Sequence, residues 1–188
     1  MTTTTITKSV PLTGDYDIDP NHSRVGFSAK HAMVTTVHGQ FLDFTADVHL
    51  DADHVENSTA RVEIKTASLD TGNADRDAHV RNSDFLDVEK FPTISFVSTG
   101  AEQSSDDDFV LHGDLTIKGI TKPLSIEFEK TGEATDPWGK HRIGFEGKAK
   151  INRKDWGVNW NAALEAGGLL VSEKVTLEFD IAAVRRDA

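Results

Sequence analysis

The 188-residue chain is long enough for one domain with a substantial core, and 37% hydrophobic and 27% charged residues are typical of a globular protein. It has no cysteine, which excludes disulfides, thiolate metal sites and a cysteine nucleophile. The net charge of −11 disfavours nucleic acid and anionic lipid headgroups as partners of the bulk surface.

The N-terminal residues 1–13, with threonines at 2–5, are predicted to form a flexible arm. This start lacks the apolar stretch that a secretory signal requires. No later stretch approaches the roughly 18 consecutive apolar residues of a membrane span. We therefore expect a cytoplasmic protein without stable membrane insertion.

Apolar and polar residues alternate with period two, the pattern of a strand with one buried face, in about eight segments. In chain order these are residues 22–29, 41–50, 60–65, 94–98, 109–117, 124–128, 142–151 and 171–183. The last is the clearest. Its apolar face carries Val171, Val175, Leu177, Phe179, Ile181 and Ala183, and Glu173 is the one interruption.

Residues 73–81 depart from this alternation and predict a short helix, capped by Asn73 and with acidic residues in its first turn. The connections between strands are short, as in the type I turn favoured by residues 136–139 (DPWG). Because such connections cannot hold crossover helices, neighbouring strands should pair antiparallel. The pattern predicts an all-β closed barrel with one helix, and leaves open whether its interior is packed or hollow.

The sequence motifs of the common enzyme classes are absent, including G-x-S-x-G, H-E-x-x-H and the phosphate-binding loops. Residues 51–54 (DADH) resemble a ligand cluster but occupy a turn, so we expect no metal site and no cofactor. His22 or His31 with Ser23 suggests a catalytic triad. However, His22 and Ser23 would point to opposite faces of a strand, so structural hydrogen bonds are expected there.

Six segments resemble, in order and spacing, the YceI-like family of polyisoprenoid-binding proteins, from about residue 14 to 184. They are YDIDPNHS (16–23), VHGQF (37–41), DFLD (84–87), FPTISF (91–96), GDLTIKGITK (113–122) and INRKDWG (151–157). The resemblance implies a lipocalin-like, eight-stranded antiparallel barrel over residues 14–188. It also implies a tunnel that binds an isoprenoid quinone, a polyprenyl phosphate or another long-chain lipid for transport or storage, without turnover, and often a homodimer.

Two features depart from the family pattern. Many members carry a secretory leader, which this sequence does not show, and this puts a periplasmic role in doubt. Trp156 stands where a phenylalanine is usual, and its larger side chain is able to shorten or reshape the cavity.

We predict that the lipid tail contacts the inward faces of the strands and that its headgroup lies at the barrel mouth. The predicted lining is Phe27, Phe96, Leu115, Ile117, Ile126, Phe128, Ile143, Phe145 and Trp156, and the predicted headgroup contacts are His31, Arg153 and Asp155. Arg153 either binds a phosphate or, as the preferred interpretation, pairs with Asp155 in a structural bridge.

Two other functions remain open at this point. An enzyme acting on an apolar substrate inside the barrel would need a nucleophile and a base among the lining residues. A ligand-free interaction module, of the kind used in stress responses, would need an interior filled by the same side chains.

Overall fold

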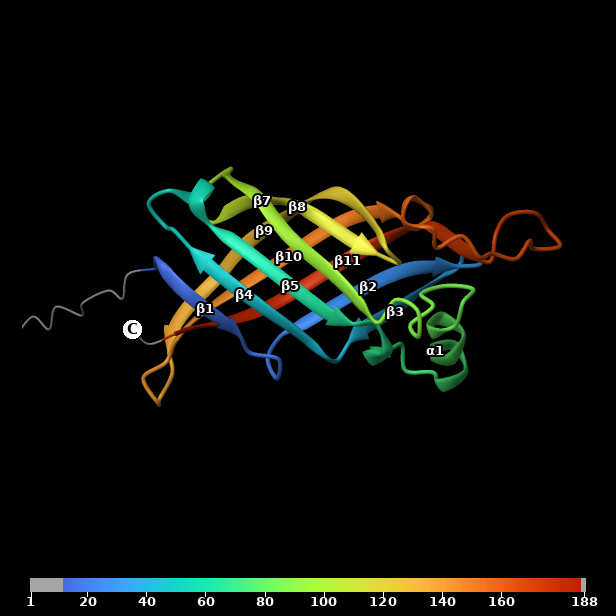
Figure 1. The fold of residues 1–188 in the computed structure, drawn as a ribbon, viewed down its shortest axis with the longest axis horizontal. Helices are drawn as coiled ribbons and strands as arrows, with labels where there is room; N and C mark the ends of the chain where they lie inside the picture. The colour runs from blue at the N-terminus through green and yellow to red at the C-terminus, as the bar shows by residue number, and fades with distance from the viewer. Residues whose placement is uncertain (1–11, 187–188) are drawn as a thin grey trace, which may run out of the picture.

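The computed structural model describes residues 12–186, in which eleven strands form a single antiparallel sheet that closes into a barrel (Figure 1). The predicted flexible arm lies outside the described residues, except for residues 12 and 13. The strands are β1 (Gly14–Ile18), β2 (Arg24–His31), β3 (Thr35–Phe41), β4 (Phe44–Leu50), β5 (Thr59–Lys65), β6 (Leu69–Asp70), β7 (Thr93–Gln103), β8 (Asp108–Ile117), β9 (Ile120–Thr135), β10 (His141–Asn152) and β11 (Val171–Arg185). The helix α1 spans Ala74–Arg81, and the 3-10 turns are η1 (Val55–Asn57), η2 (Thr66–Ser68) and η3 (Arg153–Trp156).

These strands occupy eight positions around the barrel because three positions are each shared by two short strands. Strand β11 pairs with β1 along one part of its length and with β2 along another. From there one row continues from β1 to β4 and β5, and the other continues from β2 to β3 and β6. The predicted eight-stranded antiparallel barrel is confirmed. The alternating segments do not include β1, β3 or β6. In β3 the sequence Thr35–Phe41 (TTVHGQF) mixes histidine and glycine into the strand, and β1 and β6 are only five and two residues long.

Local sequence explains several elements directly. The Asn73 side chain accepts a hydrogen bond from the Arg76 N–H at 2.9 Å, which confirms the predicted start of α1. The turn at residues 136–139 is closed by the Gly139 N–H, which donates to the Asp136 carbonyl at 2.9 Å. The break at Glu173 coincides with a β-bulge between Val171 and Val175, and the Glu173 carboxylate lies 2.6 Å from the Lys154 Nζ.

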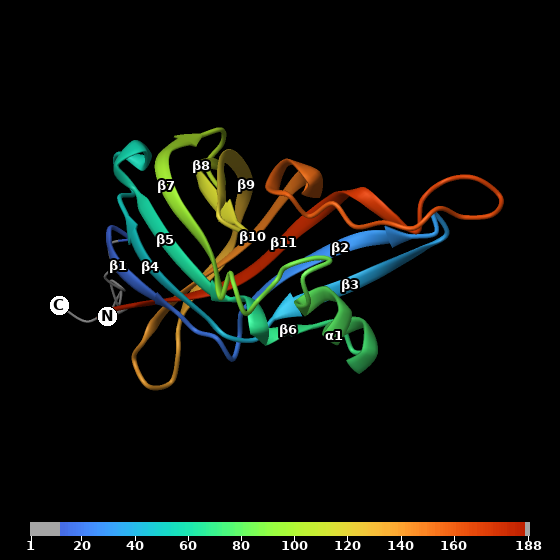
Figure 2. The ribbon, with the colours of Figure 1, turned by 45° about the vertical axis from the view of Figure 1, so that its right-hand side comes forward.

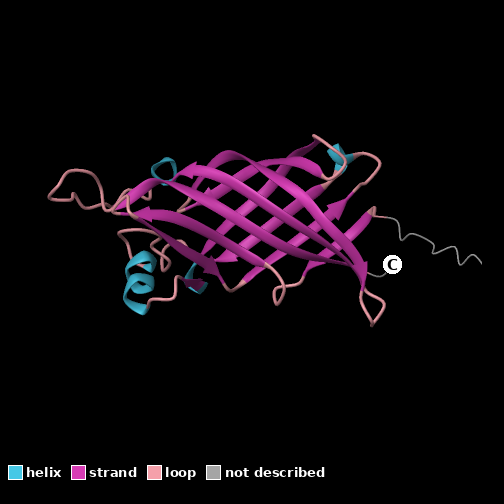
Figure 3. Cartoon of the chain, turned by 180° about the vertical axis from the view of Figure 1, so that it is seen from behind, coloured by secondary structure: helices cyan, strands magenta, loops and turns pink. Residues whose placement is uncertain are grey.

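Helix α1 lies at one end of the barrel beside β3 and β6 (Figure 2). Seen from behind, the wall consists of strands, and the helical turns are confined to the ends of the barrel (Figure 3). Among the described residues, no helix has the length and apolarity needed to cross a bilayer.

Candidate functional site

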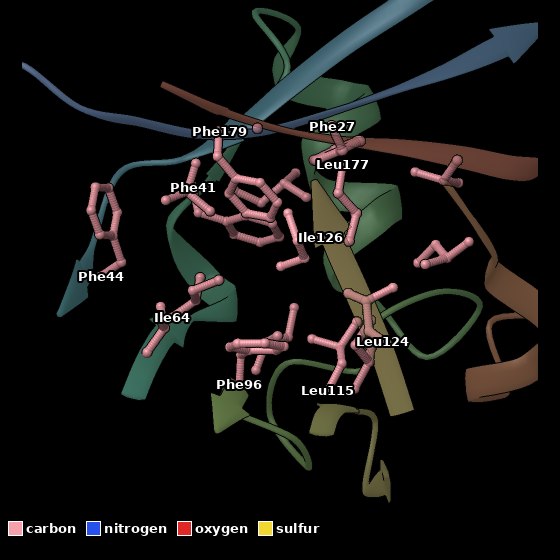
Figure 4. A pocket seen from close by; sticks show the side chains of 18 of the residues that line it. Phe27, Phe41, Phe44, Ile64, Phe96, Leu115, Leu124, Ile126, Leu177 and Phe179 are labelled. Atoms are coloured by element: carbon pink, nitrogen blue, oxygen red, sulfur yellow. The ribbon is translucent and has the colours of Figure 1, made fainter. Parts of the chain in front are cut away.

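The barrel encloses a cavity of about 620 Å³ that runs from the β1 end to the α1 end. Its wall is formed by apolar side chains from nearly every strand, and Figure 4 shows a set of them surrounding one space, ten of which are labelled. This volume lies within the range of roughly 300–1,000 Å³ that is usual for small-molecule sites. The residues of the wall that Figure 4 labels are Phe27, Phe41, Phe44, Ile64, Phe96, Leu115, Leu124, Ile126, Leu177 and Phe179.

The inward side chains of β11 show that the interior is hollow rather than packed. Val175, Leu177, Phe179 and Ile181 all face the cavity, yet each is only partly buried. In a filled core such residues would be fully buried, since protein interiors are packed as densely as organic crystals. Their remaining accessible surface therefore faces the cavity.

Glycines on neighbouring strands let three aromatic rings lie flat against the wall. A Cβ added at Gly39 would lie 2.3 Å from the Phe27 ring, and a Cβ at Gly147 would lie 2.3 Å from the Phe128 ring. Phe96 covers Gly113 in the same way. Each ring fills the space above a residue without a side chain, and this leaves the centre of the barrel open.

The β1 end of the cavity is closed by a separate cluster of buried residues. Tyr16, Ile143 and Ala183 are each at most 1% exposed and pack against Val48 and Leu50. Ile143 belongs to this plug and is not part of the cavity wall, which corrects its predicted place. Alternation put Ile143 on the inward face correctly, but at its level of the barrel the inward side chains meet.

The α1 end holds most of the polar residues that border the cavity, and we call it the mouth. It is formed by Lys30, His31, Asp75, Arg76 and His79, of which the first three are exposed. The cavity therefore reaches the protein surface at the mouth.

Three rings pack together just inside the mouth. The ring centroid of His79 lies 4.6 Å from that of Trp160 and 5.0 Å from that of Phe85, and Phe85 and Trp160 are 5.2 Å apart. The His79 Nε2 atom is 2.9 Å from a carboxylate oxygen of Asp84, which holds the imidazole in place. These rings form an aromatic collar between the apolar cavity and the polar mouth.

Arg153 borders the cavity next to this collar and is 5% exposed. Its guanidinium donates hydrogen bonds to the carbonyls of Val158 (2.6 Å), Ser172 (2.9 Å) and Val171 (3.4 Å), and lies 5.9 Å from the Phe85 ring centroid. Burial lowers the pKa of Arg153 below its usual value, and the nearby Glu173 charge partly offsets this effect. The result is a buried cation held by backbone carbonyls.

Asp155 does not take part in this arrangement. The preferred Arg153–Asp155 bridge is wrong, and Asp155, the third predicted headgroup contact, is exposed on η3 and does not border the cavity. The reason is the tight 3-10 turn Arg153–Trp156, which sends Arg153 and Trp156 inward and Asp155 outward.

The remaining predicted residues all border the cavity. Trp156 is 4% exposed, and its ring N–H donates to the Leu115 carbonyl at 2.9 Å, so it is fixed in the wall. The others are Phe27, Phe96, Leu115, Ile117, Ile126, Phe128, Phe145 and His31. Phe128 lies between Phe109 and Phe179, with ring centroids 5.5 and 5.9 Å away.

Sequence reasoning missed two kinds of lining residue. Phe109, Leu177 and Phe179 lie on apolar faces that alternation did identify, and they could have been included. Phe85 and Trp160 lie in irregular segments, where no periodic pattern indicates which way a side chain points.

The residues that suggested a catalytic triad have structural partners. The Ser23 hydroxyl oxygen accepts a hydrogen bond from the Ala182 N–H at 2.9 Å. The His22 Nδ1 atom lies 2.8 Å from Asp19, which also accepts hydrogen bonds from Arg142 at 2.7 Å and from the Asn21 N–H at 3.0 Å. The Ser23–Ala182 and Asp19–Arg142 hydrogen bonds fasten the β1–β2 connection to the barrel.

Comparison with known proteins places this architecture in a family. The family model of the YceI-like domain matches residues 16–183. A UPF0312 protein from Azotobacter vinelandii is 42% identical over 149 residues, 78% of each chain. A UPF0312 protein from Shewanella oneidensis is 40% identical over 146 residues, which are 77% of this chain and 76% of that protein.

Solved structures share the fold. The YCEI protein of Campylobacter jejuni superimposes with a TM-score of 0.73 at 29% identity, over 84% of this chain and 90% of its own. BcnA from Burkholderia cenocepacia gives a TM-score of 0.78 at 23% identity, over 88% and 99%. A polyisoprenoid binding domain from Saccharophagus degradans gives 0.68 at 13% identity, over 91% and 98%. The last two likenesses establish the fold alone, whereas the family match spans nearly the whole chain. The chain belongs to the YceI-like family.

Proposed function

We propose that this protein binds a long apolar isoprenoid-type lipid in the barrel and carries or stores it without chemical change. The observation that carries the proposal is the 620 Å³ apolar cavity. An empty apolar cavity forfeits packing contacts along its whole wall, so an apolar occupant that fills this space would stabilise the fold. Apolar walls also hold water poorly, so a hydrophobic occupant is favoured.

The volume of the cavity fits a long tail. At about 30 Å³ per water-sized group, the volume accommodates at least about 20 methylene-sized groups. Each buried methylene contributes about 0.8 kcal/mol, so a tail binds well without polar contacts. The structural neighbour from Saccharophagus degradans, described as a polyisoprenoid binding domain, supports an isoprenoid tail.

The headgroup would lie at the mouth beside His31 and Arg153. A guanidinium has five N–H donors, and three of those on Arg153 point to backbone carbonyls. Two donors remain for an oxygen of the ligand, either a quinone carbonyl or a polyprenyl phosphate. A phosphate gains more, since no carboxylate forms an ion pair with Arg153 among the described residues.

The hydroxyls that border the cavity favour binding over catalysis. The Thr71 hydroxyl donates to Asp77 at 2.6 Å and accepts from the Arg76 Nε–H at 2.7 Å. The Ser58 hydroxyl oxygen accepts from the Asp51 N–H at 2.9 Å. These two hydroxyls thus hold a helix end and a loop in place, and an enzyme acting in the barrel is the weaker proposal.

The test is to extract the protein from its native host and identify the bound lipid by mass spectrometry. We expect one lipid with a long prenyl or similar tail per chain. Incubation with excess of that lipid should yield no product over time. Repeated extracts without lipid would refute the proposal, and a time-dependent product would replace it with the enzyme alternative.

A further inference from the structure

The β2–β3 hairpin ends in apolar side chains that project into solvent. Met33 and Val34 at its turn are 66% and 79% exposed, and Leu169 on the neighbouring loop is 38% exposed. The Ala32 N–H donates to the Leu170 carbonyl at 2.7 Å, which joins the turn to this loop. We call residues 32–34 with 169–170 the apolar tip, and Figure 2 shows the hairpin and the loop extending together beyond the barrel.

The backbone of this turn is strained, because residues that are neither glycine nor asparagine occupy its two left-handed positions. Ala32 and Met33 both adopt left-handed conformations, with φ of +50° and +61°, and the Val34 N–H closes the turn on the His31 carbonyl at 3.0 Å. Asparagine and glycine are the residues that favour such a turn. A methionine at a positive φ costs stability and presents an apolar side chain to water, so folding alone does not account for it.

The charge around the apolar tip differs from that of the rest of the chain. Residues 20–42 contain no aspartate or glutamate, although the chain carries 31 of them and a net charge of −11. Between residues 156 and 172 the only charged residue is Glu165. The tip residues themselves therefore carry no carboxylate, and Lys30 adds a positive charge beside them, while Glu165 on the same loop and Asp75 at the mouth are exposed.

The apolar tip also adjoins the mouth. His31 pairs with Val171, and Lys30, His31, Leu170 and Val171 all border the cavity. A surface that inserts the tip would therefore face the opening through which a lipid enters or leaves. From this combination we propose that the apolar tip docks on the headgroup region of a lipid bilayer, with Met33, Val34 and Leu169 inserted and Lys30 at the phosphate level.

This inference rests on the proposed function for its purpose, the exchange of lipid cargo, but vesicle binding tests it independently. The protein is mixed with vesicles of phosphatidylcholine containing about one third phosphatidylglycerol and separated by flotation. We expect binding that persists at high salt, because apolar insertion dominates and salt also screens repulsion from the acidic surface.

The decisive variant is Met33→Gly combined with Val34→Ser. Glycine suits the φ of +61°, so the fold should be as stable as wild type or more so. Removing two apolar side chains should weaken vesicle binding roughly tenfold, since insertion buries them only in part. The control is Trp138→Ser, which removes an 83% exposed apolar side chain from the β9–β10 turn and should leave binding unchanged.

Several results would overturn the docking surface. They are a wild type that does not float, binding that disappears at high salt, or equal loss in the tip variant and the Trp138→Ser control. An oligomer that dissociates in the tip variant, without any change in flotation, would assign the tip to a second copy of the chain. If the wild type contains lipid but does not float with vesicles, membrane docking is refuted and the proposed function stands. If it floats but never contains lipid, the proposed function is refuted and membrane docking stands.

Discussion

At the scale of single residues, the cavity depends on how large and small side chains face each other across neighbouring strands. Phe128 is paired with Gly147, and Phe27 is paired with Gly39. In each pair the ring covers the glycine and leaves the axis of the barrel free. The same apolar residues with larger neighbours would fill the interior, so the glycines matter as much for the cavity as the phenylalanines.

Gly147→Ala should test this directly. The new Cβ would lie 2.3 Å from the Phe128 ring and must push it into the cavity. We expect a loss of about 1–3 kcal/mol in the free energy of unfolding and less bound lipid per chain. Gly132→Ala on β9 is the control, because nothing lies within 4 Å of its Cβ position. Equal effects in the two variants, in urea unfolding and lipid content, would contradict the role given to Gly147.

Phe128→Glu separates a cavity from a core. The carboxylate would stand among Phe109, Phe179 and Phe145, where an apolar tail is proposed to lie. A buried unpaired charge is costly, so the lipid should be excluded, and water can then enter and keep the domain folded. We expect a folded protein of lowered stability without lipid, while Phe128→Leu keeps its lipid. A folded Phe128→Glu variant with full lipid content would contradict the proposed position of the tail.

At the scale of elements, the β1 end is held by charged side chains that join separate connections. Arg142 on β10 donates to Asp19 in the β1–β2 connection at 2.7 Å and to Asp136 in the β9–β10 turn at 2.9 Å. The hydrogen bond from Arg142 is the main cause that lowers the pKa of Asp19, to about 2. Burial of the carboxylate opposes this shift, and hydrogen bonds from His22 and Asn21 add to it. The connection that divides β1 from β2 is thereby fixed to the barrel.

This lowered pKa predicts how stability depends on pH. The folded-state pKa of Asp19 lies below its ordinary value of 3.8. The stability that the ionised Asp19 side chain adds to the fold is therefore complete above pH 4 and is lost as the pH falls through 2. Asp19→Asn should therefore lower the free energy of unfolding by about 1–2 kcal/mol at pH 7, and the difference from wild type should shrink below pH 4.

Urea unfolding at pH 7 and at a pH near 3 measures this difference. Asp47→Asn is the control, because Asp47 is 71% exposed in its ion pair with Arg186 and exposed pairs contribute little. A difference between wild type and Asp19→Asn that stays constant from pH 7 to pH 3 would show that the Asp19 carboxylate charge is not what stabilises the connection.

At the scale of the whole molecule, closure gives the barrel two unlike ends. Tyr16, Ile143 and Ala183 plug the β1 end, while the mouth at the α1 end combines exposed polar residues with the aromatic collar. A tail that enters at the mouth would thus stop at the plug, with its headgroup beside Arg153. If the protein carries lipid as proposed, this asymmetry would confine loading and release to one end.

Removing the lipid should destabilise the molecule as a whole. A ligand present at 100 times its Kd stabilises the folded state by about 2.7 kcal/mol, which for a domain of this size is a Tm change of roughly 5–10 °C. We expect delipidated wild type to melt lower by this amount and to recover when the lipid is added back. The Phe128→Glu variant should show no recovery. An unchanged Tm after verified lipid removal would indicate that the cavity is not a ligand site.

Sequence alone determined the features that depend on near neighbours in the chain. Alternation along residues 171–183 identified the inward face of β11, and Asn73 identified the start of α1, because side-chain direction in a strand and capping at a helix are local properties. The order of six short segments indicated the family. The inward residues of the wall, Phe96, Leu115 and Ile126 among them, followed from these patterns.

Only the tertiary structure decided what those inward faces enclose. Whether side chains meet across a barrel depends on strand number, tilt and stagger, which no single strand encodes. Hence Ile143 and Phe145 share a face of β10, yet Ile143 belongs to the plug and Phe145 borders the cavity. Arg153 was likewise expected to pair with Asp155, but a 3-10 turn separates them and gives Arg153 carbonyl partners that are distant in sequence, on Ser172 and Val171.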